Sequence, residues 1–274
     1  SDVIQSDSRK PEAISFTGSN TVGRQLKKAA AERGAKIQLE MGGKNPAIVL
    51  ADADLDHAVS QVIAGAMNST GQKCTATSRA IVDRSLLDEV TERIVQRTAS
   101  LKVGDPQEAG VNIGPLISSE AAEGVLGSIE KGKSGASLAH GGGRPDGAGD
   151  GHFVSPTVFT DVEPDSFLGQ EELFGPVLGV IPVDNIEEAV EVANGVRYGL
   201  SASIFTRDIG KALAFVREVQ AGIVHVNSET AGAEPQVPFG GYKGSSSYSR
   251  EQGKSAREFF TQVKTVYFDP PPAE

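Results

Sequence analysis

The chain has 274 residues, 38% of them hydrophobic and 23% charged, so it can bury a sizeable core in one large domain or two smaller ones. Its formal net charge of −10 disfavours binding to nucleic acid or to an acidic membrane surface, because their phosphates would repel it. The single cysteine excludes an internal disulfide and a cysteine-rich metal site, and the 4 histidines stand far apart, so we predict no metal centre.

No signal segment and no apolar stretch of bilayer-spanning length is found, so we expect a soluble, cytoplasmic protein without membrane partners. Because the chain opens at Ser1 without a methionine, it is also expected to be a fragment of a longer protein.

The first predicted elements form a strand–helix–strand unit. Residues 13–16 have the pattern of a short buried strand, and residues 21–33 carry apolar side chains at helical spacing. Gly34 is placed as a C-cap, and residues 36–39 follow as a second strand. A connection of this kind implies that the two strands pair in parallel.

The same alternation continues along the chain and predicts an α/β protein with mostly parallel sheets. Asp54 is placed to cap a helix, and Ser85 and Asp88 stand at the capping-box positions of another. Residues 134–151 are rich in glycine and are predicted to form an exposed loop. Further strands are predicted at residues 46–50, 80–82, 177–183, 200–205, 223–227 and 262–268, and further helices from Asp54, at 85–101, from about 118, at 186–193 and at 208–219.

Cys74 ends the run NSTGQKC, residues 68–74. A lone cysteine can be a buried apolar filler, an incidental surface thiol or a nucleophile. The glycine and polar residues before it place the thiol on a turn, where reactive groups are usually displayed. A cysteine nucleophile attacks as the thiolate, which requires a pKa lowered by a helix start or a nearby cation, and Lys73 is adjacent in sequence.

Two other stretches could carry chemistry. Gly18 and Ser19 form a turn between a strand and a helix, and a helix start can hold a phosphate, although such turns are common. Glu40 ends a strand beside Gly42 and Gly43. It is therefore either a solvated charge or a general base whose pKa is raised by partial burial.

Taken together, these stretches resemble the aldehyde dehydrogenase superfamily. The runs at residues 15–23, 39–46 and 68–74 match its motifs in order and separation, and the resemblance covers nearly the whole chain. Downstream runs agree: EELFGP at 171–176, YGLSASIFT at 198–206 and VPFGGYK at 237–243. The runs around Cys74 and at 245–251 are most similar to the 2-oxoglutarate-semialdehyde (2,5-dioxovalerate) dehydrogenase branch.

The resemblance implies an α/β fold with an aldehyde dehydrogenase-like catalytic domain and the C-terminal remnant of a Rossmann-type cofactor domain. The remnant would be residues 1–42, the catalytic domain 43–244, and a return segment with an oligomerisation strand 245–274. The full-length enzyme would be a homo-oligomer acting on a small-molecule aldehyde, with 2-oxoglutarate semialdehyde as the expected example.

The resemblance also implies a mechanism. Cys74 would attack the aldehyde carbonyl, and its backbone N–H would help to hold the oxyanion of the thiohemiacetal. Hydride transfer to the nicotinamide of NAD or NADP would leave a thioester, and Glu40 would then activate water to release the acid. The other implied site residues are Ser19, Gly18, Gly23, Met41, Gly42, Glu172 and Phe174 for the cofactor and Phe239 and Lys73 for the substrate, with Lys44 and Asn227 as structural positions.

The family also has a long N-terminal portion that this sequence lacks, including most of the cofactor site and an asparagine of the oxyanion hole. We therefore expect an N-terminally truncated form that binds cofactor poorly and has little activity alone. Two other readings stay open: a cofactor-independent thioesterase or esterase, and a non-catalytic subunit that pairs with a partner chain through residues 262–268.

Overall fold

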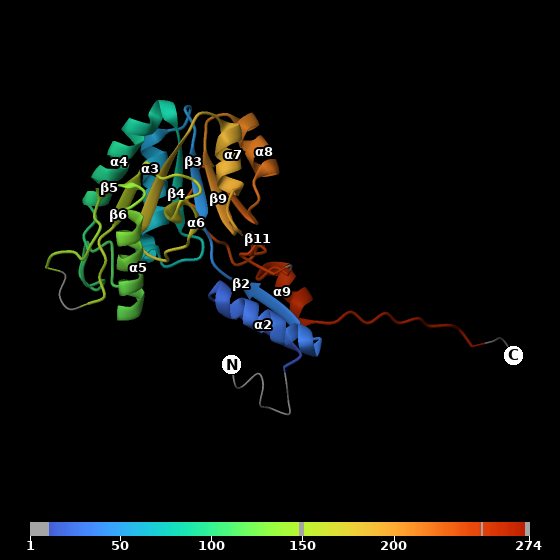
Figure 1. The fold of residues 1–274 in the computed structure, drawn as a ribbon. Coiled ribbons are helices and arrows are strands. Elements are labelled where there is room, and N and C mark those ends of the chain that lie inside the picture. The colour runs from blue at the N-terminus through green and yellow to red at the C-terminus, as the bar shows by residue number, and fades with distance from the viewer. Residues whose placement is uncertain (1–10, 148–150, 248, 272–274) are drawn as a thin grey trace.

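The computed structural model describes residues 11–147, 151–247 and 249–271. They form a large body built around a seven-stranded sheet and a small unit of one helix on a two-stranded sheet. Figure 1 shows the small unit, α2 and β2 in blue, below the large body and beside the last helix of the chain. Along these residues, no helix is both long and apolar enough to cross a membrane.

The small unit is the predicted strand–helix–strand arrangement. Strands β1 (Ala13–Thr17) and β2 (Lys36–Glu40) pair in parallel, with Thr17 opposite Glu40. Helix α2 (Asn20–Arg33) connects them. It starts at the predicted turn, where the Ser19 hydroxyl accepts from an N–H of the first turn, and it ends at Gly34, whose φ of 66° is the left-handed C-cap conformation.

The large sheet has the strand order β10-β9-β3-β4-β7-β6-β5. All neighbouring pairs are parallel except β5 with β6, so the predicted α/β class with a mostly parallel sheet is confirmed. The strands are β3 (Asn45–Val49), β4 (Thr77–Asp83), β5 (Ser137–His140), β6 (Thr157–Thr160), β7 (Val177–Val183), β9 (Ser201–Phe205) and β10 (Ile223–Val226).

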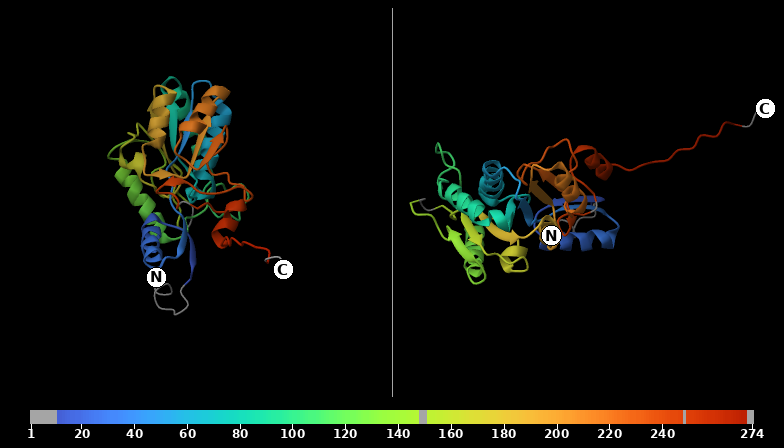
Figure 2. Two further views of the ribbon diagram at one scale, coloured as in Figure 1. Left: turned by 90° about the vertical axis from the view of Figure 1, so that its right-hand side faces the viewer. Right: turned by 90° about the horizontal axis from the view of Figure 1, so that it is seen from above.

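Helices cover both faces of this sheet (Figure 2). Alternate residues of the buried strand β3 contribute to opposite faces: Ile48 belongs to one apolar cluster and Val49 to the other. The cluster of Val49 packs under α3 (Leu55–Met67) and α4 (Leu87–Ala99), and that of Ile48 under α5 (Ser119–Gly132), α7 (Ile186–Asn194) and α8 (Ile209–Glu218), with the short α6 (Phe167–Gln170) beside them.

The chain after the sheet folds back onto the small unit. Strands β8 (Tyr198–Gly199) and β11 (Tyr242–Lys243) form a two-stranded antiparallel ladder, and the backbone then runs beside the end of β2. The N–H of Met41 donates to the carbonyl of Ser245 at 2.7 Å, and the N–H of Ser247 donates to the carbonyl of Leu39 at 2.9 Å. Helix α9 (Gly253–Phe260) follows.

Three sequence-based predictions differ from the structure. Asp83, not Ser85, caps the turn before α4: its carboxylate accepts from the Ser85 N–H at 3.0 Å and hydroxyl at 2.6 Å. The predicted loop at 134–151 contains strand β5, because the sheet edge at β6 offers a partner; residues 148–150 lie outside the described residues.

The predicted strand at 262–268 has no strand partner among the residues that the structure describes. Residues 261–271 carry no regular secondary structure and extend away from the body (Figure 1). Val263 is 97% exposed and Phe268 is 92% exposed. A strand is defined by pairing with a neighbour, so pairing of this segment with another chain stays a prediction.

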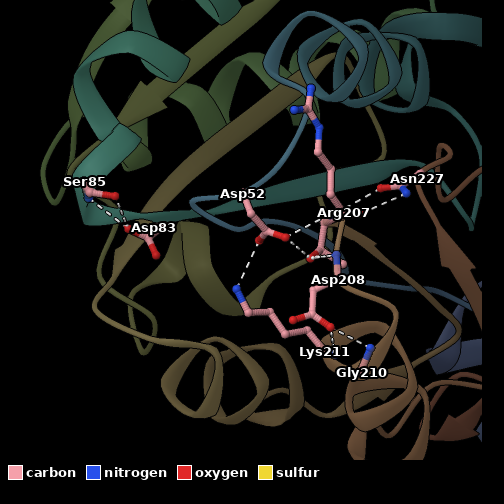
Figure 3. Close-up of polar contacts among 9 residues, drawn as sticks. Asp52, Asp83, Ser85, Arg207, Asp208, Gly210, Lys211 and Asn227 are labelled. Atoms are coloured by element: carbon pink, nitrogen blue, oxygen red, sulfur yellow. Dashed lines mark hydrogen bonds and ion pairs between the residues drawn. The ribbon is translucent and has the colours of Figure 1, made fainter.

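A cluster of polar groups connects the carboxyl ends of β3, β9 and β10 through hydrogen bonds (Figure 3). The Asp52 carboxylate accepts from the Thr206 hydroxyl at 2.7 Å and the Arg207 N–H at 2.9 Å, and it pairs with Lys211 at 3.2 Å. The Asn227 side chain exchanges two 3.0 Å hydrogen bonds with the backbone of Thr206, in place of a strand neighbour. Asn227 therefore has a structural role.

Replacing Asp52 by asparagine is expected to reduce the free energy of unfolding by about 1 kcal/mol at neutral pH. Burial tends to raise the pKa of Asp52, but the hydrogen bonds from Thr206, Arg207 and Lys211 outweigh it and lower the pKa to about 2. A carboxylate with a depressed pKa stabilises the fold above its unfolded pKa, and that contribution is lost as the pH falls through the folded pKa.

Urea unfolding of the wild type and of Asp52→Asn, from about pH 7 down to about pH 3, checks this expectation. The difference between the two proteins should shrink as the pH falls. Asp56→Asn is the matched control, because its carboxylate is 83% exposed and pairs only at the surface with Arg93. A gap that stays constant with pH would show that the ionised carboxylate is not the stabilising group.

Candidate active site

The predicted catalytic residues lie near the amino ends of β3 and β4, Glu40 at the end of β2 and Cys74 on the loop before β4. Strand β2 ends at Glu40, and two glycines lead from it into β3. Cys74 follows the short 3-10 turn Asn68–Gly71 and precedes β4. The two loops touch, because a Cβ on Gly43 would overlap the Cys74 carbonyl oxygen. The structure therefore brings Cys74 and the end of the Glu40 strand together.

The backbone at Cys74 is held by Asn45, a buried residue that the sequence reasoning did not single out. Its amide nitrogen donates to the carbonyls of Cys74 and Ala76, both at 2.8 Å. Its amide oxygen accepts from the N–H of Ser201 at 3.0 Å, which ties the turn to β9. The only sequence signal was its place directly after the Gly42-Gly43-Lys44 run.

The turn before Cys74 is in a costly conformation. Ser69 and Thr70 have φ values of 55° and 57°, followed by Gly71 at 66°. Left-handed backbone costs a residue other than glycine roughly 1–2 kcal/mol. The Thr70 hydroxyl compensates by donating to the Gly114 carbonyl at 3.2 Å. Gly71 itself approaches the Gly175 carbonyl so closely that a side chain there would overlap it.

The Cys74 thiol is protonated at neutral pH. Burial raises its pKa to about 11, and the nearby Glu172 and Glu40 carboxylates act in the same direction. A reactive thiolate requires a lowered pKa, but burial, Glu172 and Glu40 all raise the pKa of Cys74. Among the described residues, no neighbouring cation lowers it, contrary to the expectation. Lys73 is exposed, although it is adjacent in sequence.

Glu40 is a buried carboxyl group, 1% exposed. Its Oε2 accepts a hydrogen bond from the Ser246 hydroxyl, while its Oε1 is buried with no hydrogen-bond partner among the described residues. Burial raises the pKa of Glu40 to about 8; the Ser246 hydrogen bond lowers it in part, Glu251 raises it and Arg250 lowers it. The solvated-charge alternative is thus wrong, and the group can exchange a proton near neutral pH.

Glu172 joins this site from the loop before β7. Its Oε1 accepts from the Gly43 N–H at 3.0 Å, and a Cβ on Gly42 would overlap its carboxylate. Phe174, on the same loop, is 47% exposed and has a φ of 55°. The structure therefore places Glu172 directly against the Gly42-Gly43 backbone, as expected for residues of one site.

The remaining predicted cofactor residues lie at the start of α2. Gly18 and Ser19 are exposed there, and the Gly18 N–H donates to the Glu40 carbonyl at 3.0 Å. Gly23 allows close packing, since a Cβ on it would overlap the Met41 side chain. Asn20 was missed: it accepts from the Gly42 N–H at 3.2 Å and donates to the Gly244 carbonyl at 2.5 Å.

Arg79 holds the backbone of the loop that contains Lys44. The Arg79 guanidinium is fully buried and donates to the carbonyl of Lys44 at 2.8 and 3.1 Å. It also donates to Val192 and Ala193 at the end of α7. Burial lowers the pKa of Lys44 to about 7, and Arg79 adds to the effect.

The two predicted substrate residues do not share a pocket. Phe239 lines a cavity of about 420 Å³ together with His225 and Val237. Lys73 lines a small recess of about 20 Å³ with Glu172 and Phe174, on the cofactor-residue side of the site. Within residues 11–147, 151–247 and 249–271, no group of three or more His, Cys, Asp or Glu side chains could hold a metal ion.

The fold and this arrangement agree with the comparison to known proteins. A sequence model of the aldehyde dehydrogenase family matches residues 4–266, and the chain therefore belongs to that family. The chain is 51% identical to the alpha-ketoglutaric semialdehyde dehydrogenase of Bacillus subtilis, over 94% of its own length and 54% of the relative. It is 46% identical to the alpha-ketoglutarate semialdehyde dehydrogenase of Haloferax volcanii, over 93% and 54%.

Solved structures show the same likeness. An NAD-dependent aldehyde dehydrogenase from Sinorhizobium meliloti superposes with a TM-score of 0.93 at 37% identity, covering 99% of this chain and 54% of that one. A Mycobacterium tuberculosis aldehyde dehydrogenase complexed with NAD+ gives a TM-score of 0.89 at 39% identity, covering 94% and 54%. The chain spans about half the length of the curated relatives it matches.

Proposed function

We propose that this chain is the catalytic portion of an NAD(P)-dependent dehydrogenase that oxidises an aldehyde to a carboxylic acid, with 2-oxoglutarate semialdehyde as its substrate. The observation that carries the proposal is the pairing of a fixed cysteine with a buried carboxyl group of raised pKa, Cys74 with Glu40. The names of the Bacillus subtilis and Haloferax volcanii relatives support the substrate.

In the first half-reaction, the Cys74 thiol gives up its proton to solvent and Sγ bonds to the aldehyde carbon as the carbonyl π bond opens, while the Cys74 backbone N–H donates to the developing oxyanion. Asn45 orients this peptide by holding the Cys74 carbonyl. A nicotinamide cofactor, held by Ser19 and Glu172, would supply the hydride acceptor, and Cys74 would then carry the acyl group as a thioester.

In the second half-reaction, Glu40 accepts a proton from water as the water attacks the thioester carbon. The carbon–sulfur bond breaks, the acid leaves, and Cys74 is regenerated. A general base acts best when its pKa lies near the working pH, which the pKa of Glu40, about 8, satisfies. Because no cofactor takes part in this half, an ester that acylates Cys74 directly can also be turned over.

The cofactor fits the residues that the described chain offers. The start of α2 presents Gly18 and Ser19 to solvent, and a helix start favours a phosphate group. The Glu172 carboxylate is fixed by the Gly43 N–H and would accept from a ribose hydroxyl, with Phe174 exposed beside it. Gly23, Met41 and Gly42 would line this site. Phe239 would contact the substrate from its cavity, whereas Lys73 lies in the recess of Glu172 and Phe174, on the cofactor side.

We also propose the domain division 1–42, 43–244 and 245–274, with the first range as the end of a cofactor-binding domain. The separate sheet of β1 and β2 supports that boundary. The half of the relatives that this chain does not span would complete the cofactor site and the oligomer. Both NAD and NADP remain candidates, and NAD is the cofactor of the Mycobacterium tuberculosis neighbour.

The test is nicotinamide reduction, followed by absorbance, with both cofactors and a panel of aldehydes that includes 2-oxoglutarate semialdehyde. We expect turnover when the chain is joined to, or mixed with, the complementary half from the Bacillus subtilis relative, and little from the chain alone. Preference for a different aldehyde would reject the substrate, and a complemented enzyme without any aldehyde-dependent reduction would reject the proposed function.

A further inference from the structure

The Ser246 hydroxyl connects the return segment to the Glu40 carboxylate. It accepts from the Gly241 N–H at 2.7 Å and donates to Glu40 Oε2. With its oxygen bound by an N–H, the hydroxyl proton is directed at the carboxylate instead of rotating freely. The Ser246 hydroxyl thus has one fixed hydrogen-bond donor, the Gly241 N–H, and one fixed acceptor, Glu40 Oε2. Among the described residues, Oε2 is the only Glu40 oxygen that takes part in a hydrogen bond.

The backbone around Ser246 leaves this hydroxyl little freedom to move. Glu40 and Ser246 are bridged as antiparallel strand partners. On either side, the Met41 N–H donates to the Ser245 carbonyl at 2.7 Å, and the Leu39 N–H donates to the Ser247 hydroxyl at 2.8 Å. The hydrogen bonds on both flanks fix the register, so Ser246 is held opposite Glu40.

The two oxygens of Glu40 are consequently unequal. Oε2 is occupied by Ser246, while Oε1 is buried without a partner, about 2.8 Å from the place where a Gly240 Cβ would lie. A carboxylate oxygen that already accepts a strong hydrogen bond is the less basic of the two, because that bond stabilises its charge. The oxygen left to accept a new proton is Oε1.

We propose that Ser246 is a positioning residue that fixes the Glu40 carboxylate and assigns Oε1 as the oxygen that takes the proton from the hydrolytic water. The inference rests on the proposed function of Glu40 and deepens it. As water attacks the thioester of Cys74 and the carbon–sulfur bond breaks, the water proton passes to Oε1. Ser246 keeps its own proton throughout, so it changes the base without entering the reaction.

Other charged groups around Glu40 also act on its titration. Arg250 lowers the pKa of Glu40 and Glu251 raises it, while the Glu40 carboxylate in turn raises the pKa of Cys74. None of these contacts is removed by shortening Ser246. The loss of the Ser246 hydroxyl should therefore act on Glu40 through the single hydrogen bond.

The first test is a direct titration of Glu40 in the chain, by NMR of side-chain carboxyl groups labelled with carbon-13 and assigned with Glu40→Gln. We expect Ser246→Ala to raise the pKa of Glu40 by roughly half to one unit, since the hydrogen bond favours the charged form. Ser247→Ala is the matched control, because it removes a neighbouring hydroxyl that accepts from Leu39 and does not touch Glu40. Ser246→Thr should restore the wild-type value.

The second test uses p-nitrophenyl acetate, which acylates Cys74 without cofactor. In Ser246→Ala, the initial burst should keep its amplitude while the pH midpoint of the steady-state rate moves upward with the Glu40 titration. An unchanged pKa and midpoint in both Ser246→Ala and Ser246→Gly would overturn the proposed role of Ser246. Failure of the wild type to give a burst would instead contradict the proposed nucleophile, so the two failures are distinguishable.

Discussion

The variant Cys74→Ser is expected to lose the burst of p-nitrophenol release by roughly a thousand-fold or more. The serine hydroxyl is a much weaker acid than the thiol, and in this site the Glu172 and Glu40 carboxylates disfavour any anion at this position. For the wild type, acylation should rise with pH, because the reactive thiolate forms only as the pH approaches the pKa of Cys74, about 11.

Stopped-flow absorbance across the pH range measures the burst, and alkylation by iodoacetamide reports the thiolate fraction independently. Ser78→Ala is the matched control, because Ser78 lies on strand β4, which follows Cys74, and its hydroxyl has no hydrogen-bond partner among the described residues. A burst of wild-type size in Cys74→Ser would exclude Cys74 as the nucleophile.

Replacing Glu40 by glutamine is expected to leave the burst intact and to slow the steady-state phase by roughly 100- to 1000-fold. The amide keeps the shape of the side chain but cannot accept the water proton. In the wild type the steady-state rate should rise through about pH 8, since only the deprotonated carboxyl group of Glu40 acts as base. In Glu40→Gln that rise should vanish.

The same variant is expected to be more stable. The folded pKa of Glu40, about 8, lies above the value of an unfolded glutamate, so the folded state binds the extra proton between the two values. Stability therefore falls as the pH rises through this window, and a neutral glutamine avoids the loss, by roughly 2–4 kcal/mol at about pH 8. Urea unfolding of both proteins at pH 5 and pH 8, roughly the ends of this window, checks the sign. Equal stability at the higher pH would mean that Glu40 is ionised in the fold without penalty.

Local features of the fold were predictable from sequence because short-range chemistry determines them. Gly34 ends its helix in the left-handed conformation, and Asp54 caps the next by accepting from the His57 N–H, as expected. Ser85 failed as a cap because its own N–H and hydroxyl both donate to the carboxylate of Asp83, two residues before it. Competition between neighbouring caps is decided by geometry that the sequence pattern does not contain.

In the candidate site, too, some features could be predicted from the sequence and others could not. Cys74 and Glu40 could be singled out as candidates from their motifs, and their roles stay predictions. The direction of the thiol pKa shift could not be predicted, because it depends on burial and on Glu172, which is distant in sequence. Asn45 and Ser246 were missed for the same reason. Each acts through hydrogen bonds to segments distant in sequence, and the sequence pattern around neither residue shows those partners.

The return segment has a consequence for the order in which the site is built. Glu40 and its hydroxyl partner Ser246 are 206 positions apart, whereas Cys74 and its clamp Asn45 are 29 apart. Contacts at long sequence separation form only after the intervening chain exists. A growing polypeptide therefore acquires the nucleophile long before the base is set, so a nascent chain could be acylated but not yet released from its acyl group. On the proposed roles, hydrolytic competence arrives only after residue 246 has been synthesised and has docked beside Glu40.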